Sequence, residues 1–276
     1  MTQARVVWIC VCALVAACSE AHPRGSDDTG DDDVLSPSDD SADDSSGDDS
    51  TAVDAPPIID VDAEPHNPGD PDAAPAVPVT TTITQSTNNT TVASPNSASC
   101  HNDYNVTAEN SYYRAYVLAE HGIASAFSIS GVRVGVETTA DDPSPTDPAQ
   151  ATQPAAIRLY TYSEAPGTAL NLAAMTGIGS ANVTFANGLA ATLVDFPVTG
   201  TVPAGGTLIV EVAIPDGDPD GDSYGPHFFI GSNTAGETRS GYLRAPECGA
   251  ANPSQLTALS LPSMHMIIDV TGTYLP

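Results

Sequence analysis

Short runs in which apolar residues alternate with polar or small ones are the feature that most limits how this chain can fold. Successive side chains of a β-strand point to opposite faces, so a period of two predicts a strand with one buried face. In the run 208–214 this places Glu211 on the outer face and Leu208, Val210, Val212 and Ile214 inward. Comparable β-rich runs occur at 79–84, 111–118, 132–137, 157–162, 228–230 and 264–270.

The segments between these runs are rich in turn-forming residues. Pro, Gly and Asp dominate at 141–145, 165–167, 202–206 and 215–217, and these residue types favour tight turns. No window carries a long, capped helical repeat, and 169–176 is the nearest to one. We therefore predict an all-β fold, a single antiparallel β-sandwich that is jelly-roll-like and covers about 200 residues, 77–276, enough for one sizeable core.

The segment 18–76 has a different composition. It holds about half of the Asp and Glu residues, spaced by Ser, Gly and Pro, and it has too little apolar surface to offset the entropy cost of ordering. We predict a disordered acidic linker that acts as an extended tether. The alternatives are that its Asp clusters bind divalent cations or direct export to the cell surface. The formal net charge of the whole chain is −28, which argues against nucleic acid as a partner.

The first seventeen residues have the pattern of a signal peptide. Residues 1–5 carry one positive charge, 6–14 form an apolar run, and Leu14-Val15-Ala16-Ala17-Cys18 follows. The apolar stretch is shorter than a membrane-spanning helix. This pattern resembles the lipobox of bacterial lipoproteins. The alternatives are a retained membrane anchor and an ordinary secretory signal with a chance cysteine.

Several expectations come from the resemblance to bacterial lipoproteins. It implies cleavage before Cys18, acylation of its thiol, and attachment of the mature protein to a membrane. An Asp directly after the cysteine tends to retain members of that family at the inner membrane. Here that residue is Ser19, which favours the outer membrane. The predicted organisation is a signal peptide at 1–17, the tether at 18–76 and the sandwich at 77–276.

Two cysteines, Cys100 and Cys248, lie in the folded part. In an exported chain a pair of cysteines predicts a disulfide. The bridge would close a loop of well over 100 residues, which the chain-entropy model values at up to about 4 to 5 kcal/mol. The alternative is two separate buried thiols.

An Asp-rich loop follows the run 208–214. Its carboxylates come at alternate positions with a glycine after the third, as in the first half of an EF-hand calcium loop. The position that would supply the bidentate glutamate is His227, so the match stops there. We predict a weak calcium site, and the alternative is a solvated turn. Its ligands would be Asp216, Asp218, Asp220 and Asp222.

The sequence contains none of the catalytic motifs that we sought: HExxH, GxSxG, a Walker loop, CxxC or a dinucleotide fingerprint. Met264-His265-Met266 could suggest copper ligation, but on a strand both methionines point the same way, which favours core packing. The histidines of the folded part are scattered in the sequence, and each is predicted to be a surface or satisfied core residue: His101, His121, His227 and His265. Several tyrosines could stack on sugars or pack in the core: Tyr112, Tyr113, Tyr116, Tyr160 and Tyr162, with Arg114 and Arg158 nearby.

The order of segments in the folded part also resembles a module of secreted and cell-surface bacterial proteins. The residues that carry the resemblance are 109–114, 131–137, 202–205, 228–233 and 264–266. It implies an architecture and a setting, not a catalytic residue. The predicted function is a binding or structural module at the cell envelope, surface-exposed in one reading, with an extracellular carbohydrate or protein as partner. The alternative is a hydrolase whose Ser/His/Asp or paired-carboxylate site is assembled from separate strands.

Overall fold

The computed structural model describes residues 76–142, 152–221 and 224–276. The predicted signal peptide, Cys18 and all but the last residue of the predicted tether lie outside the described residues, so their roles stay predictions. In the described part of the chain, no helix is long and apolar enough to cross a membrane.

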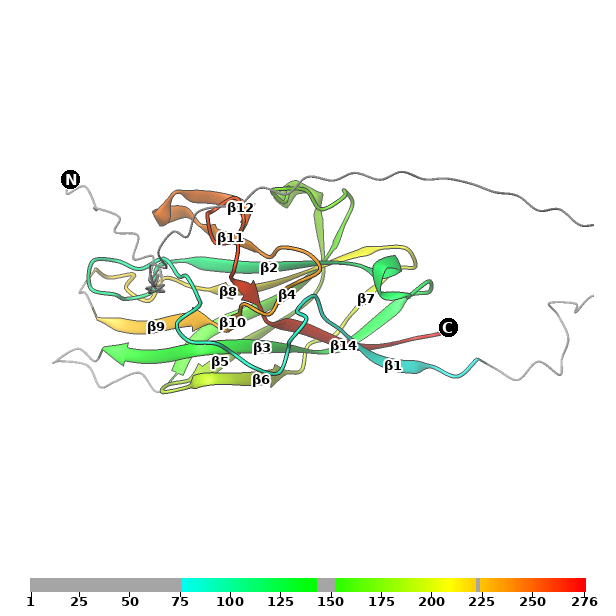
Figure 1. Cartoon of the computed structure of the whole chain (residues 1–276), viewed down its shortest axis with the longest axis horizontal. Helices are drawn as coiled ribbons and strands as arrows, with labels where there is room; N and C mark the ends of the chain where they lie inside the picture. The colour runs from blue at the N-terminus through cyan, green and yellow to red at the C-terminus, as the bar shows by residue number, and fades with distance from the viewer. Residues whose placement is uncertain (1–75, 143–151, 222–223) are drawn as a thin grey trace, which may run out of the picture. The chain divides into compact units, whose positions relative to one another are not determined.

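Two six-stranded antiparallel sheets make up most of the folded unit (Figure 1). The first sheet contains β1 (Val79–Ile83), β14 (Ile268–Tyr274), β3 (Phe127–Asp142) and β6 (Ala190–Phe196), with β7 (Gly200–Val202) and β9 (Gly225–Ile230) also paired to β3. The second sheet has the order β12 (Ala250–Gln255), β11 (Tyr242–Ala245), β2 (Asn110–Val117), β8 (Thr207–Ile214), β4 (Thr152–Tyr162) and β5 (Met175–Ala186). A two-stranded sheet pairs β10 (Ser232–Asn233) with β13 (His265–Met266).

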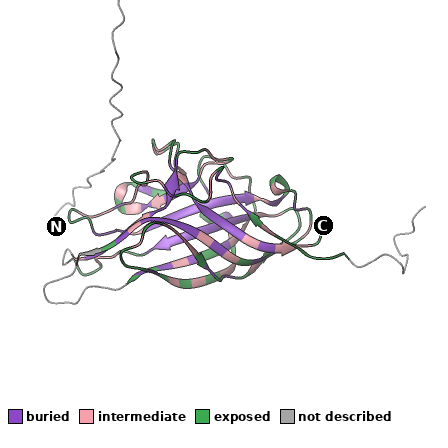
Figure 2. Cartoon of the chain, turned by 60° about the horizontal axis from the view of Figure 1, so that its bottom comes forward, coloured by how far each residue is buried: buried purple, intermediate pink, exposed green. Residues whose placement is uncertain are grey.

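One hydrophobic core lies between the two large sheets. The inward residues of β8 pack in the same buried cluster as Val132, Val134 and Val136 of β3. Phe185 of β5 meets Phe196 of β6 edge to face, with ring centroids 5.1 Å apart. Figure 2 shows buried residues along much of the length of the strands. The predicted all-β, single antiparallel sandwich is therefore confirmed, and the chain crosses repeatedly between the sheets, as at β2 to β3 and β8 to β9.

The segment nearest to a helix, 169–176, forms a 3-10 turn, Leu172–Ala174, before β5 begins. One predicted strand differs from the structure. The run 264–270 is not one strand. Ile267 separates β13 from β14, and its amide N–H donates to the carbonyl of Gly231 at 2.9 Å, so the chain leaves the small sheet there and joins β3.

The predicted disulfide is confirmed. Cys100 and Cys248 are bonded, with their Cα atoms 5.9 Å apart and a sequence separation of 148. Cys100 precedes β2, and Cys248 lies in the 3-10 turn Pro246–Cys248 after β11. Because β11 and β2 are neighbours in the second sheet, the bridge joins the turn after β11 to the segment before β2.

A buried charge joins parts of the chain that are distant in sequence. The Arg114 side chain is fully buried, and its Nη1 contacts Oε2 of Glu237 at 2.7 Å. Arg114 also donates to the carbonyl oxygens of Arg239, at 2.6 Å, and of Met266. Breaking such a pair leaves a charge without a partner in a place that water does not reach.

We predict that Glu237→Gln lowers the free energy of unfolding by about 3 to 5 kcal/mol, because the Arg114 guanidinium keeps its charge and loses its counter-ion. Chemical denaturation of the two purified proteins measures the difference. The matched control is Glu120→Gln, which breaks the exposed 2.6 Å pair with Arg239 and should cost less than about 1 kcal/mol. Equal losses in both variants would contradict the prediction.

Candidate functional site

The outer face of the second sheet is partly covered, and this changes the environment expected for Glu211. The alternation of β8 places Glu211 on the outer face, as predicted. However, only 5% of the surface of Glu211 is exposed to solvent. A second hydrophobic cluster forms on this face. Its buried members are Tyr113, Ala115, Tyr162, Leu170, Ala174, Ile209 and Tyr242.

Three side chains hold the Glu211 carboxylate. Tyr113 Oη donates to Oε1 at 2.9 Å, Tyr160 Oη donates to Oε2 at 2.7 Å, and Arg158 Nη1 donates to Oε2 at 3.2 Å. Tyr113 and Arg158 are the direct register partners of Glu211 on β2 and β4. Burial, followed by the hydrogen bond to Glu211, raises the pKa of Tyr160 to about 12. Tyr160 therefore stays protonated at neutral pH and remains a donor.

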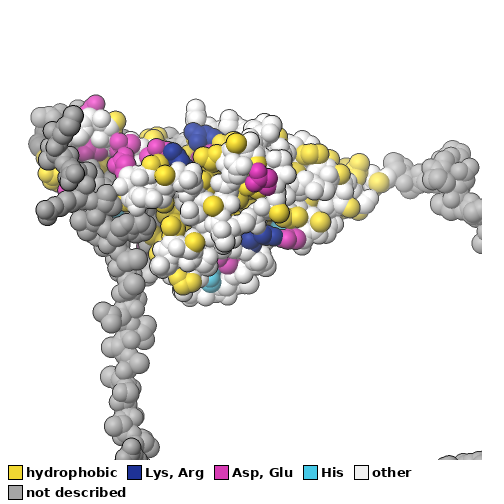
Figure 3. Space-filling model, turned by 90° about the horizontal axis from the view of Figure 1, so that it is seen from above, with side chains coloured by type: hydrophobic (Ala, Val, Ile, Leu, Met, Phe, Trp, Pro, Cys, Tyr) yellow, Lys and Arg dark blue, Asp and Glu magenta, His cyan; other side chains and the backbone are white. Residues whose placement is uncertain are grey.

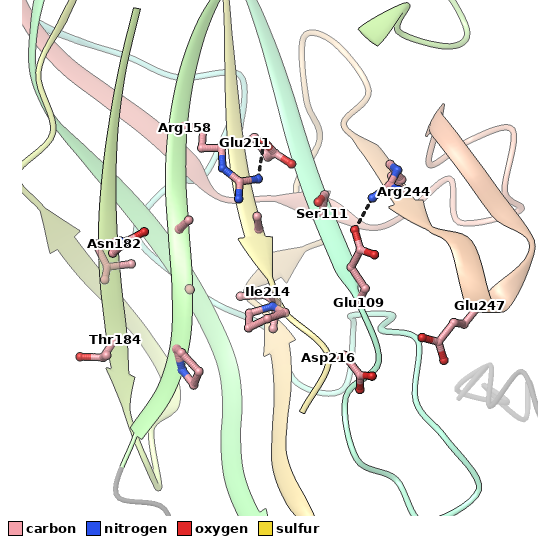
Figure 4. A pocket seen from close by; sticks show the side chains of 16 residues that line it. Glu109, Ser111, Arg158, Asn182, Thr184, Glu211, Ile214, Asp216, Arg244 and Glu247 are labelled. Carbon is pink, nitrogen blue, oxygen red and sulfur yellow. Dashed lines mark hydrogen bonds and ion pairs between the residues drawn. The ribbon is translucent and has the colours of Figure 1, made fainter. Parts of the chain in front are cut away.

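A groove of about 810 Å³ lies beside this carboxylate (Figure 4). Its floor is low because Ser111, Ala213 and Ala156 occupy one row across β2, β8 and β4, in direct register. Longer side chains stand around this row of small ones. The complete lining is Glu109, Ser111, Pro154, Ala155, Ala156, Arg158, Asn182, Val183, Thr184, Glu211, Ala213, Ile214, Pro215, Asp216, Arg244 and Glu247.

A second, smaller depression of about 260 Å³ adjoins the groove. Arg158, Glu211 and Arg244 line both hollows. Arg244 Nη1 is ion-paired with Oε1 of Glu109. Tyr160 and Met175 line the smaller hollow, so an aromatic and apolar surface adjoins the polar groove.

The sequence allowed two roles for the tyrosines, packing in the core or contact with a ligand, and the structure distinguishes between these roles. Tyr112 and Tyr116 are fully buried in the main core, and their hydroxyls donate to the carbonyls of Ala98 and Ile268. Tyr113 and Tyr162 are buried in the second cluster. Tyr160 is half-buried and lines the smaller depression. Tyr113 also lines that depression and donates to Glu211, whereas packing accounts for Tyr112, Tyr116 and Tyr162.

Two carboxylates of the Asp-rich loop accept hydrogen bonds, one from within the loop and one from Asn102. The Asp218 amide donates to Oδ1 of Asp216 at 3.0 Å, and Asn102 Nδ2 donates to Oδ2 of Asp218 at 2.8 Å. Asp220 is exposed, and Asp222 lies outside the described residues. Among the residues that are described, no three His, Cys, Asp or Glu side chains are placed to hold a metal ion together. The calcium site of Asp216, Asp218, Asp220 and Asp222 stays a prediction.

Two of the four histidines come together, which the sequence could not reveal. The rings of His101 and His227 have centroids 6.5 Å apart, and His101 lies 4.7 Å from the ring of Phe229. Burial, and then repulsion by His227, lowers the pKa of His101 to about 4. In contrast, His265 Nδ1 accepts a hydrogen bond from the Gly236 amide at 2.8 Å. Met264 and Met266 are both buried, so the expected core packing of these methionines is confirmed.

Comparison with protein-family models, with curated proteins and with solved structures gives no match to this chain. The resemblances to bacterial lipoproteins and to cell-surface modules therefore stay predictions.

We predict that His101 makes the fold less stable in acid. The folded state favours the neutral ring, whereas the unfolded ring has the ordinary pKa of 6.5. As the pH falls from about 6.5 to about 4, the unfolded chain binds a proton that the folded chain does not, so stability is lost in that window. His101→Phe keeps an aromatic ring beside Phe229 and should lose stability less steeply over that range, measured by denaturant melts. Parallel pH profiles for both proteins would refute this.

Proposed function

We propose that this protein is a lipoprotein of the bacterial cell envelope, anchored to the outer membrane through an acylated Cys18. The segment 18–76 acts as a tether, and the β-sandwich binds an extracellular carbohydrate. The anchor rests on the lipobox-like sequence at 14–18. The binding role rests on the groove over the second sheet.

The groove carries the proposal because its polar groups project from neighbouring strands of one sheet toward the same hollow, and one of them, Arg158, is already held by Glu211. Ser111, Arg158 and Asn182 project from three different strands, and Glu211 fixes one end of Arg158. The paired strands fix the backbone positions of these side chains, and the ion pair with Glu211 limits the freedom that Arg158 would lose on binding, which lowers the entropy cost of recognition. Sugar hydroxyls both donate and accept, so they suit a surface that mixes amide, hydroxyl, carboxylate and guanidinium groups.

A carbohydrate hydrolase is the second candidate, and one observation favours it. Burial, together with repulsion from Asp216 and Glu109, raises the pKa of Glu247. A carboxyl of raised pKa beside a second carboxylate is the pair that glycoside hydrolysis uses as acid and base. Release of new reducing ends that stops in Glu247→Gln would support the hydrolase over the binding module.

We predict that Cys18→Ala detaches the protein from membranes or stalls its processing, because the acylated thiol is lost. Fractionation of a lipoprotein-producing bacterial host that expresses each form, followed by immunoblotting, measures location and size. A variant that fractionates with membranes as efficiently as wild type, at the processed size, would rule out the anchor.

We predict that Ala156→Phe abolishes carbohydrate binding by the full chain, because the ring would fill the low floor of the groove without changing any charge. Arg158→Ala should weaken binding by about tenfold, the loss expected for a charge-assisted hydrogen bond. A glycan array finds the ligand, and titration calorimetry measures the affinities.

The control for these variants is Thr201→Phe, which adds the same ring at an exposed position of β7 in the first sheet. It should bind as wild type does. Carbohydrate binding that survives Ala156→Phe and fails in Thr201→Phe would place the site on the other sheet. Binding of proteins but of no glycan would reject the carbohydrate role.

A further inference from the structure

The two sides of the groove differ in charge. Asn182 and Thr184 of β5 form a neutral side, whereas Glu109, Asp216 and Glu247 lie on the opposite side (Figure 4). The acidic side comes from three separate parts of the chain: the residue before β2, the turn after β8 and the 3-10 turn after β11. A ligand that crosses the groove therefore meets hydroxyl and amide groups at one side and carboxylates at the other.

The negative charge on the acidic side is not balanced by the protein. Every Arg of the described part is in an ion pair, and none of those five pairs includes Asp216 or Glu247. Figure 3 shows the basic side chains of one face lying next to acidic ones. The lining contains two arginines, of which Arg244 pairs with Glu109 and Arg158 pairs with Glu211. The pKa of Glu247 is raised first by burial and then by repulsion from Asp216 and Glu109, and a cation beside these carboxylates would relieve the repulsion.

The floor of the groove does not suit a peptide bound through its backbone. Strand addition needs a sheet edge with free N–H and C=O groups. The central floor strands are internal, since β8 pairs with β2 and β4, and β4 pairs with β8 and β5. Strand β5 is the edge of this sheet, but on the floor of the groove recognition is left to side chains. Several side chains of the lining can bind hydroxyl groups: Ser111, Asn182, Thr184 and Arg158.

We propose that the groove binds an oligosaccharide with free amino groups, whose ammonium lies at Asp216 and Glu247 and whose hydroxyls lie along Ser111, Asn182 and Thr184. This inference rests on the proposed carbohydrate-binding function and names the class of sugar. The ammonium supplies the charge that the acidic side lacks. The Arg158 guanidinium, held by Glu211, donates to hydroxyls at the other end.

The test is titration calorimetry of the purified full chain with three oligosaccharides of equal length: a glucosamine oligomer, its fully N-acetylated form and a glucose oligomer. We expect the glucosamine oligomer to bind at least about tenfold more tightly than either neutral one at low salt. The difference should shrink as ionic strength rises, since exposed charges are screened.

The double variant Asp216→Asn/Glu247→Gln should weaken binding of the glucosamine oligomer by at least about fivefold. It should leave the affinity for the neutral oligomers within about twofold. The matched control is Asp195→Asn/Glu120→Gln, which removes two carboxylates that do not line the groove. Thermal melts establish that both double variants are folded.

The outcomes separate this inference from the function on which it rests. If the neutral oligomers bind as tightly as the glucosamine oligomer, the amine preference is wrong and carbohydrate binding stands. If none of the three binds and a broad glycan array is also negative, both proposals fall. If a short oligolysine binds and the glucosamine oligomer does not, the acidic side serves a basic peptide, which also overturns the inference.

Discussion

The groove depends on one buried carboxylate on the outer face of a β-sheet. Glu211 is nine-tenths or more buried, yet both of its oxygens are satisfied by donors from neighbouring strands. A buried carboxylate without such partners would cost several kcal/mol. Because Tyr113, Tyr160 and Arg158 all converge on it, this one charge fixes the boundary between the groove and the smaller hollow.

The shape and the charge of the groove have separate causes. Its depth comes from the row of Ser111, Ala213 and Ala156, which are too small to fill the space between longer neighbours. Its charge comes from residues outside the strands, Asp216 and Glu247, which loops bring to one side. In many binding proteins the strands supply a rigid scaffold and the loops supply the residues that determine specificity. The floor and the charged rim of this groove follow that arrangement.

The sequence predicted the sandwich well and the site poorly, for physical reasons. Alternation along β8 assigned its inward residues, and two cysteines were enough to predict the disulfide. The same alternation made Glu211 appear solvent-facing, because Tyr113 and Tyr242, which help to cover that face, come from strands far away in sequence. Asn182 and Thr184 alternate with Ala181, Val183 and Phe185 in β5, but alternation shows only that they face outward and not that they border a groove. A row such as Ser111, Ala213 and Ala156 can be recognised only when the register of the three strands is known.

The most direct test of a carbohydrate site on the second sheet is nuclear magnetic resonance shift mapping of the full chain during titration with a bound oligosaccharide. The account predicts that the largest amide shifts cluster at Ala156, Asn182, Ala213 and their neighbours in the groove. Shifts that cluster instead on the outer face of the first sheet, around Thr201 and Thr271, would contradict it, because binding would then use a surface without the groove.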